Sequence, residues 1–260
     1  MLTFRQYLRP QTLDEAYALC QKRANLVLGG MLWLKMQNRT VDTVIDLCGL
    51  GLDQVEDLGE EWRIGAMVSL RTLETHPGLA ASTHGAMADC LRHIVGVQFR
   101  NLATVGGSIY GRFGFSDPLT LFLALGAVVE LHHAGAVPLA DFVSQPYERD
   151  ILTHLRLPKH PGRVAYLSQR NTATDFPVLT CAVAVGEQGG RCAIGARPMK
   201  ACLTELELPG EITPETASAA ADQVAEQTVF GSNLRAGADY RRAICRVLVR
   251  RALLACKEEE

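Results

Sequence analysis

Two pairs of adjacent glycines, Gly29-Gly30 and Gly106-Gly107, constrain the fold of this chain more than any other feature of its sequence. Glycine lets the backbone adopt positive φ and come close to a ligand, and successive amides in such a turn form a nest for an anion. The first pair follows residues 25–28, which predict a short buried strand, and precedes residues 31–36, which can wind as a helical turn. Two such nests suit a pyrophosphate group.

The residues around the glycine pairs argue against two common nucleotide-binding motifs. Neither pair fits the Gly-x-Gly-x-x-Gly fingerprint, and neither is followed by the Lys-Ser or Lys-Thr of the Walker pattern. A Rossmann or P-loop protein is therefore disfavoured. Taken singly, a glycine pair between a strand and a helix is more often turn geometry than a binding site.

The second pair lies within residues 100–118, RNLATVGGSIYGRFGFSDP, which interrupt a helical pattern that covers residues 78–95. A structureless stretch of this length inside a compact region is usually a binding loop, and we expect one here. The next residues, 119–125, predict a buried helix.

Helix and strand signals organise the N-terminal part of the chain. Thr12 and Glu15 form a capping box for a first helix that should end near residue 23, and Ser69 is placed to cap a helix from Leu70. Strands are expected at residues 43–47, 62–66, 127–132 and 151–157.

A proline- and glycine-containing stretch at residues 158–162 marks a boundary, because such residues end regular elements. Thr213-Pro214 supplies an N-cap and the favoured first-turn proline of a helix, and an apolar stripe over residues 240–255 predicts the last helix. Consecutive antiparallel strands are expected between them at residues 163–169, 178–185 and 191–196.

Charge and hydropathy exclude several classes of protein. The 26 lysines and arginines against 28 aspartates and glutamates give a net charge of −2, which disfavours nucleic-acid binding. The longest uncharged apolar stretch, residues 118–129, is too short to cross a bilayer, so no membrane partner is expected. Arg5 and Arg9 would fall inside the apolar core of a signal peptide, so we expect a cytoplasmic protein.

Candidate metal ligands and catalytic pairs are weak. The eight cysteines include no Cys-x-x-Cys pair, so we expect no metal or cluster held by this chain alone. His132-His133 would face opposite sides of a strand. Cys90 and His93 would share a helix face but lack an orienting partner. The arginines of the last helix predict a solvated face or a surface for an acidic partner.

Several segments together resemble a known family in its own order along nearly the whole chain. They are VLGGMLWLKM at 27–36, IDL at 45–47, IGA at 64–66, the run from RNLATVGGS to LALGAVVEL, then PLADF, ILTHLRLP, TDFPVLTCAVAV and DYRRAICRVLVRRAL. The chain resembles the FAD-binding medium subunit of the xanthine dehydrogenase and carbon monoxide dehydrogenase class of molybdenum hydroxylases.

The resemblance implies an α+β fold. Residues 1–160 would form a vanillyl-alcohol-oxidase-like FAD-binding domain with two subdomains, about 1–55 and 56–160. Residues 161–260 would form a C-terminal α+β domain with an antiparallel sheet and helices.

The resemblance also implies the cofactor, FAD, and its contacts. Residues 27–34 would form the first pyrophosphate loop and residues 104–108 the second. Asp117 would lie near the adenosine half, Ile94 would be an apolar contact and Leu152 would lie beside the isoalloxazine. From the residues alone, Asp117 fits N-capping of the following helix equally well. The implied cofactor-binding residues are Val27, Leu28, Gly29, Gly30, Met31, Leu32, Trp33, Leu34, Ile94, Thr104, Val105, Gly106, Gly107, Ser108, Asp117 and Leu152.

The chain departs from the family pattern at three places. Met31, Leu32 and Trp33 stand where the family has small or polar residues, which leaves backbone amides to bind phosphate. Ser108 replaces the family's asparagine after the second glycine pair, and keeps a donor. The family's lysine before a C-terminal strand aligns near residues 167–168, where Arg170 is the nearest cation.

The function implied by the resemblance is electron transfer. The chain would pass electrons through FAD between a partner [2Fe–2S] cluster and NAD+ or another acceptor, beside a molybdenum-cofactor subunit, with both partners as separate chains. No side chain of this protein need act as a catalytic acid or base. The alternative, motivated by residues 31–33, is a structural or assembly subunit with weakened or lost flavin binding. A self-sufficient oxidase is disfavoured because no substrate acid, base or covalent flavin attachment residue stands out.

Overall fold

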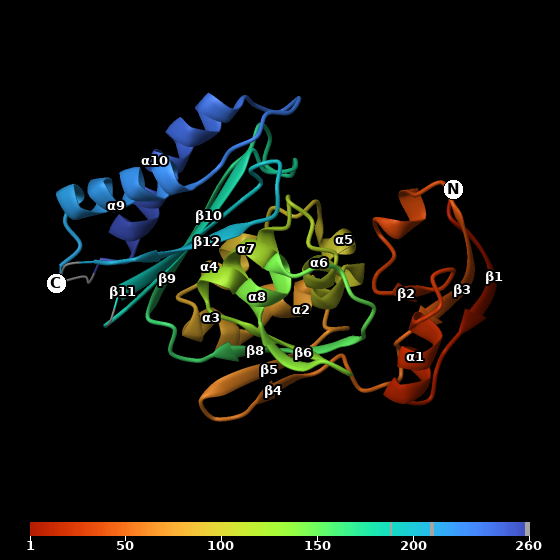
Figure 1. The fold of residues 1–260 in the computed structure, drawn as a ribbon. Coiled ribbons are helices and arrows are strands. Elements are labelled where there is room, and N and C mark those ends of the chain that lie inside the picture. The colour runs from red at the N-terminus through yellow and green to blue at the C-terminus, as the bar shows by residue number, and fades with distance from the viewer. Residues whose placement is uncertain (188, 209–210, 258–260) are drawn as a thin grey trace.

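The computed structural model describes residues 1–187, 189–208 and 211–257 and contains three β-sheets. Each sheet belongs to one of three units, which we call the N-terminal, central and C-terminal units (Figure 1). Mixed helices and sheets with an antiparallel C-terminal sheet confirm the expected α+β class.

The N-terminal unit is a small parallel sheet with one helix. Its elements are β1 (Thr3–Leu8), α1 (Leu13–Cys20), β2 (Leu26–Leu28), the 3-10 turn η1 (Leu34–Met36) and β3 (Thr40–Asp46), and the strand order is β1-β3-β2. Thr12 caps α1 as expected, since its Oγ1 accepts a hydrogen bond from the amide of Glu15 at 3.1 Å. The helix ends at Cys20, earlier than expected. Beyond it, the side-chain Nδ2 of Asn25 donates a hydrogen bond to the carbonyl of Leu19 at 2.9 Å.

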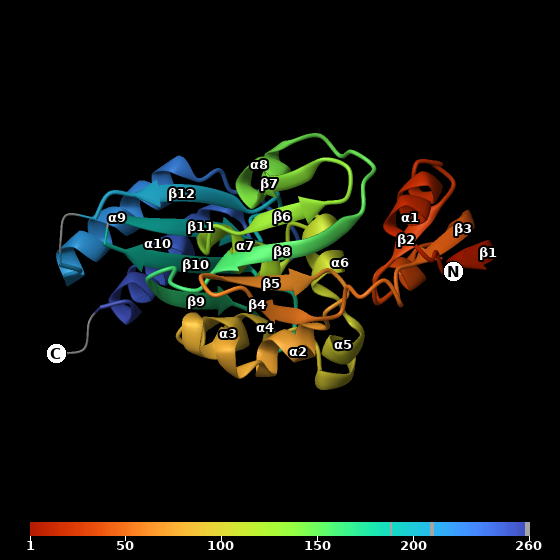
Figure 2. The same cartoon turned by 90° about the horizontal axis from the view of Figure 1, so that it is seen from below.

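The central unit is a five-stranded sheet in the order β4-β5-β8-β6-β7, covered on one face by helices (Figure 2). Its strands are β4 (Val55–Asp57), β5 (Glu61–Gly65), β6 (Val128–Leu131), β7 (Gly135–Pro138) and β8 (Leu152–Pro158). Its helices are α2 (Leu70–Thr75), α3 (Pro77–Ser82), α4 (Ala86–Leu91), α5 (Val97–Leu102), α6 (Val105–Tyr110), α7 (Asp117–Ala124) and α8 (Leu139–Ser144).

The expectation that residues 100–118 lack regular structure is wrong, because much of this segment is helical. It contains the end of α5, all of α6 and the start of α7. Thr104 and Ser116 each accept a hydrogen bond from an amide three residues later, at 3.2 Å in both cases, and so begin α6 and α7. Gly106 and Gly107 occupy the first turn of α6.

The helical pattern predicted over residues 78–95 forms two helices, α3 and α4, instead of one. His84 and Gly85 separate them, because both adopt positive φ, at 51° and 81°. A helix cannot continue through two residues with left-handed backbone.

The C-terminal unit is an antiparallel sheet covered by two helices on its outer face (Figure 1). Its elements are β9 (Arg163–Gln169), β10 (Leu179–Gly186), β11 (Gly189–Gly195), β12 (Cys202–Leu206), α9 (Pro214–Gln227) and α10 (Ala238–Ala255). The antiparallel pairing of β9, β10 and β11 is confirmed, as is the capping of α9 by Thr213. Strands β1, β4, β7 and β12 were not expected.

Helices α4 and α7 of the central unit lie between the two larger sheets. Both contact the inner face of the C-terminal sheet, so one apolar core runs from Ile64 on β5 through Phe122 on α7 to Ala193 on β11. At the start of α7, Asp117 accepts a hydrogen bond from Tyr166 of β9. Among the described residues, no helix is long and apolar enough to span a bilayer.

Candidate functional site

A cavity of about 610 Å³ lies where the three units meet. Its walls come from β2 and the turn after it, from α6 and the start of α7, from the segment before β8, and from the β9–β10 loop. Every residue of the expected cofactor site except Val105 lines this cavity; Val105 is fully buried. A cavity of this volume suits a large organic cofactor.

The two glycine turns abut each other within the cavity wall and do not face each other across a gap. A Cβ on Gly29 would lie 2.5 Å from Thr104 Oγ1, and a Cβ on Gly30 would lie 1.8 Å from the carbonyl oxygen of Leu102. At Gly30 the neighbour is backbone, which leaves no room for a larger residue. At Gly29 the neighbour is the Thr104 hydroxyl that caps α6, so a larger residue would displace the cap.

The first turn has backbone amides to offer a ligand. Among the described residues, no acceptor receives the amide hydrogen of Gly30, Met31 or Leu32. The residues line the cavity, and three successive amides of this kind can form a nest for an anion.

The second turn does not offer its amides in the same way. The amides of Val105 and Gly106 donate to the carbonyls of Val68 and Ala66 at 2.9 and 2.8 Å, and the amide of Gly107 donates to Thr104 Oγ1 at 3.2 Å. The expectation of two anion-binding nests is therefore wrong, because the amides at the start of α6 already donate hydrogen bonds within the protein. Gly106 is also packed against Ala66, whereas Gly107 is exposed to the cavity.

The bulky residues after the first glycine pair pack against other apolar side chains of the protein. Met31 takes positive φ, at 60°, and packs against the small core of the N-terminal unit, while Leu32 is buried in the main core. Trp33 packs in an aromatic cluster with Phe99, Phe115 and Phe176, at ring-centroid distances of 5.3 to 5.7 Å. All three residues also line the cavity.

Replacing Trp33 with serine should weaken folding and should not tighten cofactor binding. The indole joins three segments that are distant in sequence, and losing a half-buried aromatic of this kind costs roughly 2 kcal/mol. Urea unfolding of the Trp33→Ser chain measures the loss, with Trp33→Phe as the matched control that keeps most of the packing. Unchanged stability together with tighter binding would mean that the indole crowds the turn.

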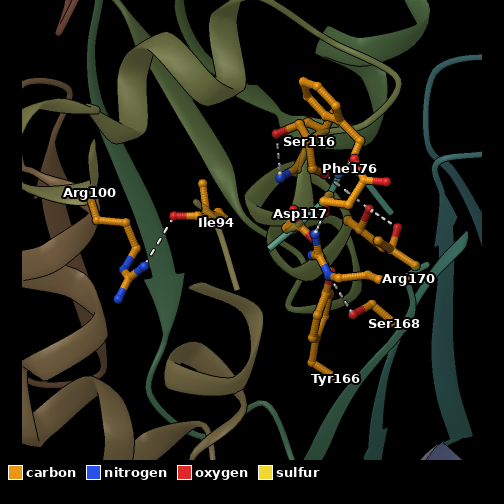
Figure 3. Close-up of polar contacts among 12 residues, drawn as sticks. Ile94, Arg100, Ser116, Asp117, Tyr166, Ser168, Arg170 and Phe176 are labelled. Carbon is orange, nitrogen blue, oxygen red and sulfur yellow. Dashed lines mark hydrogen bonds and ion pairs between the residues drawn. The ribbon is translucent and has the colours of Figure 1, made fainter. Parts of the chain in front are cut away.

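Ile94 is held at the cavity by a buried arginine (Figure 3). Arg100 pairs with Glu74 through two hydrogen bonds of 2.7 and 3.1 Å, and its Nη1 donates to the carbonyl of Ile94 at 3.1 Å. Leu152, at the start of β8, is also buried and lines the cavity. Both residues supply apolar wall to the cavity.

Asp117 is not the N-cap of α7, because Ser116 takes that role and Asp117 is the first residue of the helix. Its carboxylate is buried and accepts hydrogen bonds from Tyr166 Oη at 2.5 Å and from Arg170 Nη2 (Figure 3). Burial raises the pKa of Asp117 to about 6, against the opposing effects of Arg170 and Tyr166.

Several cavity residues were missed by sequence reasoning. Arg149 was not expected to contribute; its guanidinium donates to three carbonyls at the end of α1, those of Cys20, Lys22 and Arg23, at 2.8 to 3.2 Å. Phe113 and Phe115 lie in the quoted glycine-rich segment, yet no periodicity marks them. Their role depends on contacts between distant segments.

The weaker candidates have structural explanations. His132 Nε2 contacts Asp14 at 2.8 Å, and His133 stacks on Tyr17. Cys90 is fully buried, which raises the pKa of its thiol well above its usual range. On α10, Arg246 pairs with Asp222 of α9 at 2.6 Å.

Arg241, the remaining arginine of interest on α10, is fully buried. Its guanidinium donates to the backbone carbonyls of Val178, Gly231 and Ala236. This arginine therefore holds the C-terminal unit together and is not part of a solvated face.

Two family models together match nearly the whole chain. Residues 2–160 match the FAD binding domain in molybdopterin dehydrogenase, and residues 165–256 match the CO dehydrogenase flavoprotein C-terminal domain.

Relatives and solved structures match over nearly their full length. The chain is 26% identical over 273 residues to the nicotine 6-hydroxylase medium subunit of Paenarthrobacter nicotinovorans, with 96% of each chain covered. It is 26% identical over 281 residues to the carbon monoxide dehydrogenase medium chain of Hydrogenophaga pseudoflava, again covering 96% of each. A solved structure of that carbon monoxide dehydrogenase, lacking the Mo-pyranopterin moiety, gives a TM-score of 0.86 at 25% identity, with 96% of both chains covered.

Proposed function

The chain belongs to the family of FAD-binding domains of molybdopterin dehydrogenases, and we propose that it passes electrons through FAD between a partner's [2Fe–2S] cluster and NAD+ or another acceptor. It is a flavoprotein medium subunit of a molybdenum hydroxylase complex, and its cofactor is FAD. Bound FAD supplies the redox chemistry, since it can take up electrons singly and release them as a pair.

The main support for this proposal is a large cavity lined by backbone amides that donate no hydrogen bond to the described part of the protein. The amides of Gly30, Met31 and Leu32 would hold the diphosphate, and the exposed backbone of Gly107 leaves room for it. Backbone amides stabilise phosphate oxygens without a cationic side chain. The residues present therefore fit the cofactor.

The remaining residues of the site would orient the cofactor and exclude water. Ile94 and Leu152 contribute apolar wall, and the Asp117 carboxylate is an acceptor for a hydroxyl group. Under this proposal residues 1–160 form the FAD-binding domain and residues 161–260 the C-terminal domain. The limits of the two family models support this division.

We propose that the [2Fe–2S] cluster and the molybdenum cofactor lie on separate partner chains. The names of the relatives support this, since each is called a medium subunit or medium chain. The alternative role, an assembly subunit without flavin, was motivated by residues 31–33. Their side chains have apolar partners within the protein, and the match to the FAD binding domain favours a subunit that holds flavin.

Isolation of the complex from its native host tests the proposal. We expect two further chains, identified by mass, and flavin in the purified complex. After anaerobic chemical reduction, added NAD+ should reoxidise the flavin and yield NADH, whereas a flavin that reacts only with quinones or dyes would exclude NAD+ as the acceptor. A medium subunit recovered without partner chains would contradict the proposed electron path.

A further inference from the structure

The carboxylate of Asp117 is held by only one of its two oxygens. Tyr166 Oη and Arg170 Nη2 both bind Oδ1, and Oδ2 receives no hydrogen bond from another residue that the structure describes. Asp117 also lines the cavity. Oδ2 is therefore the oxygen left to accept a hydrogen bond from a bound molecule.

Arg170 is fixed by three acceptors at once (Figure 3). Its Nε donates to Ser168 Oγ at 3.1 Å, its Nη1 to the carbonyl of Asp175 at 2.5 Å, and its Nη2 to Asp117. The guanidinium is almost fully buried, with 7% of the side chain exposed. A planar guanidinium anchored at each nitrogen has one orientation, which a flexible ammonium group would lack.

The two partners of Asp117 come from a different unit of the molecule. Asp117 begins α7 of the central unit, whereas Tyr166 lies on β9 and Arg170 directly follows it. The orientation of a cavity carboxylate is thus set by the C-terminal unit.

We propose that Arg170 is a positioning residue for the cofactor: by holding Oδ1 of Asp117, it presents Oδ2 to a hydroxyl group of FAD. This inference rests on the proposed function and extends it. It makes the C-terminal unit part of the cofactor site, although none of its residues was expected to bind FAD.

The charge state of Asp117 provides a specific readout of this role. The ionisable groups that face the carboxyl are Tyr166 and Arg170 from the C-terminal unit and Cys90 from α4. Burial already raises the pKa of Asp117 to about 6, and removing the cation would raise it further. A carboxyl protonated near neutral pH is a weaker acceptor, so FAD affinity in such a variant should recover in alkaline buffer.

The test is a titration of the full-length chain, stripped of flavin, with FAD. Arg170→Leu should weaken FAD binding by about ten- to a hundredfold, the value of a charged hydrogen bond. In an Asp117→Asn background the same substitution should have no further effect, since Arg170 acts through that carboxylate. Arg170→Lys should retain more FAD affinity than Arg170→Leu. If Arg170→Leu does not fold, the lysine variant is titrated in its place.

Arg235→Leu is the matched control. Arg235 also binds the β9–β10 loop, through Asp175 Oδ1 at 3.2 Å, but does not contact Asp117. We expect little change in FAD affinity and no new pH dependence in this variant. Parallel titrations of the wild type and Arg170→Leu with ADP and FMN assign the hydroxyl. Weaker binding of ADP by the variant places it on the adenosine ribose, and weaker binding of FMN places it on the ribitol.

Two results would overturn the inference. If Arg170→Leu lowers FAD affinity equally in the wild-type and Asp117→Asn backgrounds, Arg170 only supports the fold. If FAD affinity is unchanged in both Arg170 variants, Arg170 does not contribute to cofactor binding. A wild-type chain that takes up no FAD would instead contradict the proposed function.

Discussion

Gly107→Leu should abolish FAD binding and leave the fold intact. Gly107 is exposed to the cavity, and a Cβ there meets only Thr104 Oγ1, at 3.2 Å. A leucine side chain would therefore extend into the space that the diphosphate needs. We expect affinity to fall roughly a hundredfold or more, about 2.7 kcal/mol, in a fluorescence titration of the flavin-free chain.

The stability of the same variant separates loss of the site from loss of the fold. Gly107 lies in the first turn of α6, where leucine is a better helix former than glycine by up to about 1 kcal/mol. The midpoint of unfolding should therefore stay the same or rise. Gly186→Leu is the control, because Gly186 ends β10 away from the cavity and has no atom within 4 Å of its Cβ position. Full FAD binding by Gly107→Leu would show that the diphosphate lies elsewhere.

Gly30→Ala should damage both folding and FAD binding. The added methyl would lie 1.8 Å from the carbonyl oxygen and 2.6 Å from the carbonyl carbon of Leu102. Backbone cannot move aside as a flexible side chain can, so the two turns must separate. Overpacking of this severity costs roughly 3 kcal/mol or more, which denaturant unfolding measures directly.

Gly96→Ala is the matched control for Gly30→Ala. Gly96 precedes α5 in the same region, and its Cβ position is 3.6 Å from its nearest neighbour, Gln98 Oε1. Its loss of stability should be roughly 0.5 to 1 kcal/mol, because glycine is preferred to alanine at a helix N-cap. If Gly30→Ala unfolds at the wild-type midpoint and retains FAD, the two turns are not in contact as described.

The parts of the fold predicted from sequence are those specified by local signals. The turn at Gly29-Gly30 follows a strand, Thr12 and Thr213 cap their helices, and the consecutive apolar segments that became β9, β10 and β11 form an antiparallel sheet. In each case the determining residues lie within a few positions of one another, so periodicity and capping rules suffice.

The predictions that were wrong concern features that depend on contacts between distant segments. The glycine content of residues 100–118 suggested a loop, but Thr104 and Ser116 cap helices there, and the amides of α6 bind the carbonyls of Ala66 and Val68. The capping residues were visible in the sequence. The long-range amide contacts were not, and they remove the second anion nest.

The environment of Asp117 shows the same limit. Its position one residue after Ser116 makes it the first helical residue instead of the cap, a difference that helix-boundary rules do not resolve. Its partners Tyr166 and Arg170 lie 49 and 53 residues away. The packing of α7 on β10 and β11, and of α4 on β9, brings them together.

The flavin content of the purified chain tests the proposed cofactor site most directly. The central claim is that the amides after Gly29-Gly30, in the cavity between the three units, bind the diphosphate of FAD. We expect the preparation to absorb in the flavin bands, or to acquire that absorbance on titration with FAD, to one FAD per chain. A colourless preparation that takes up no added FAD would contradict it.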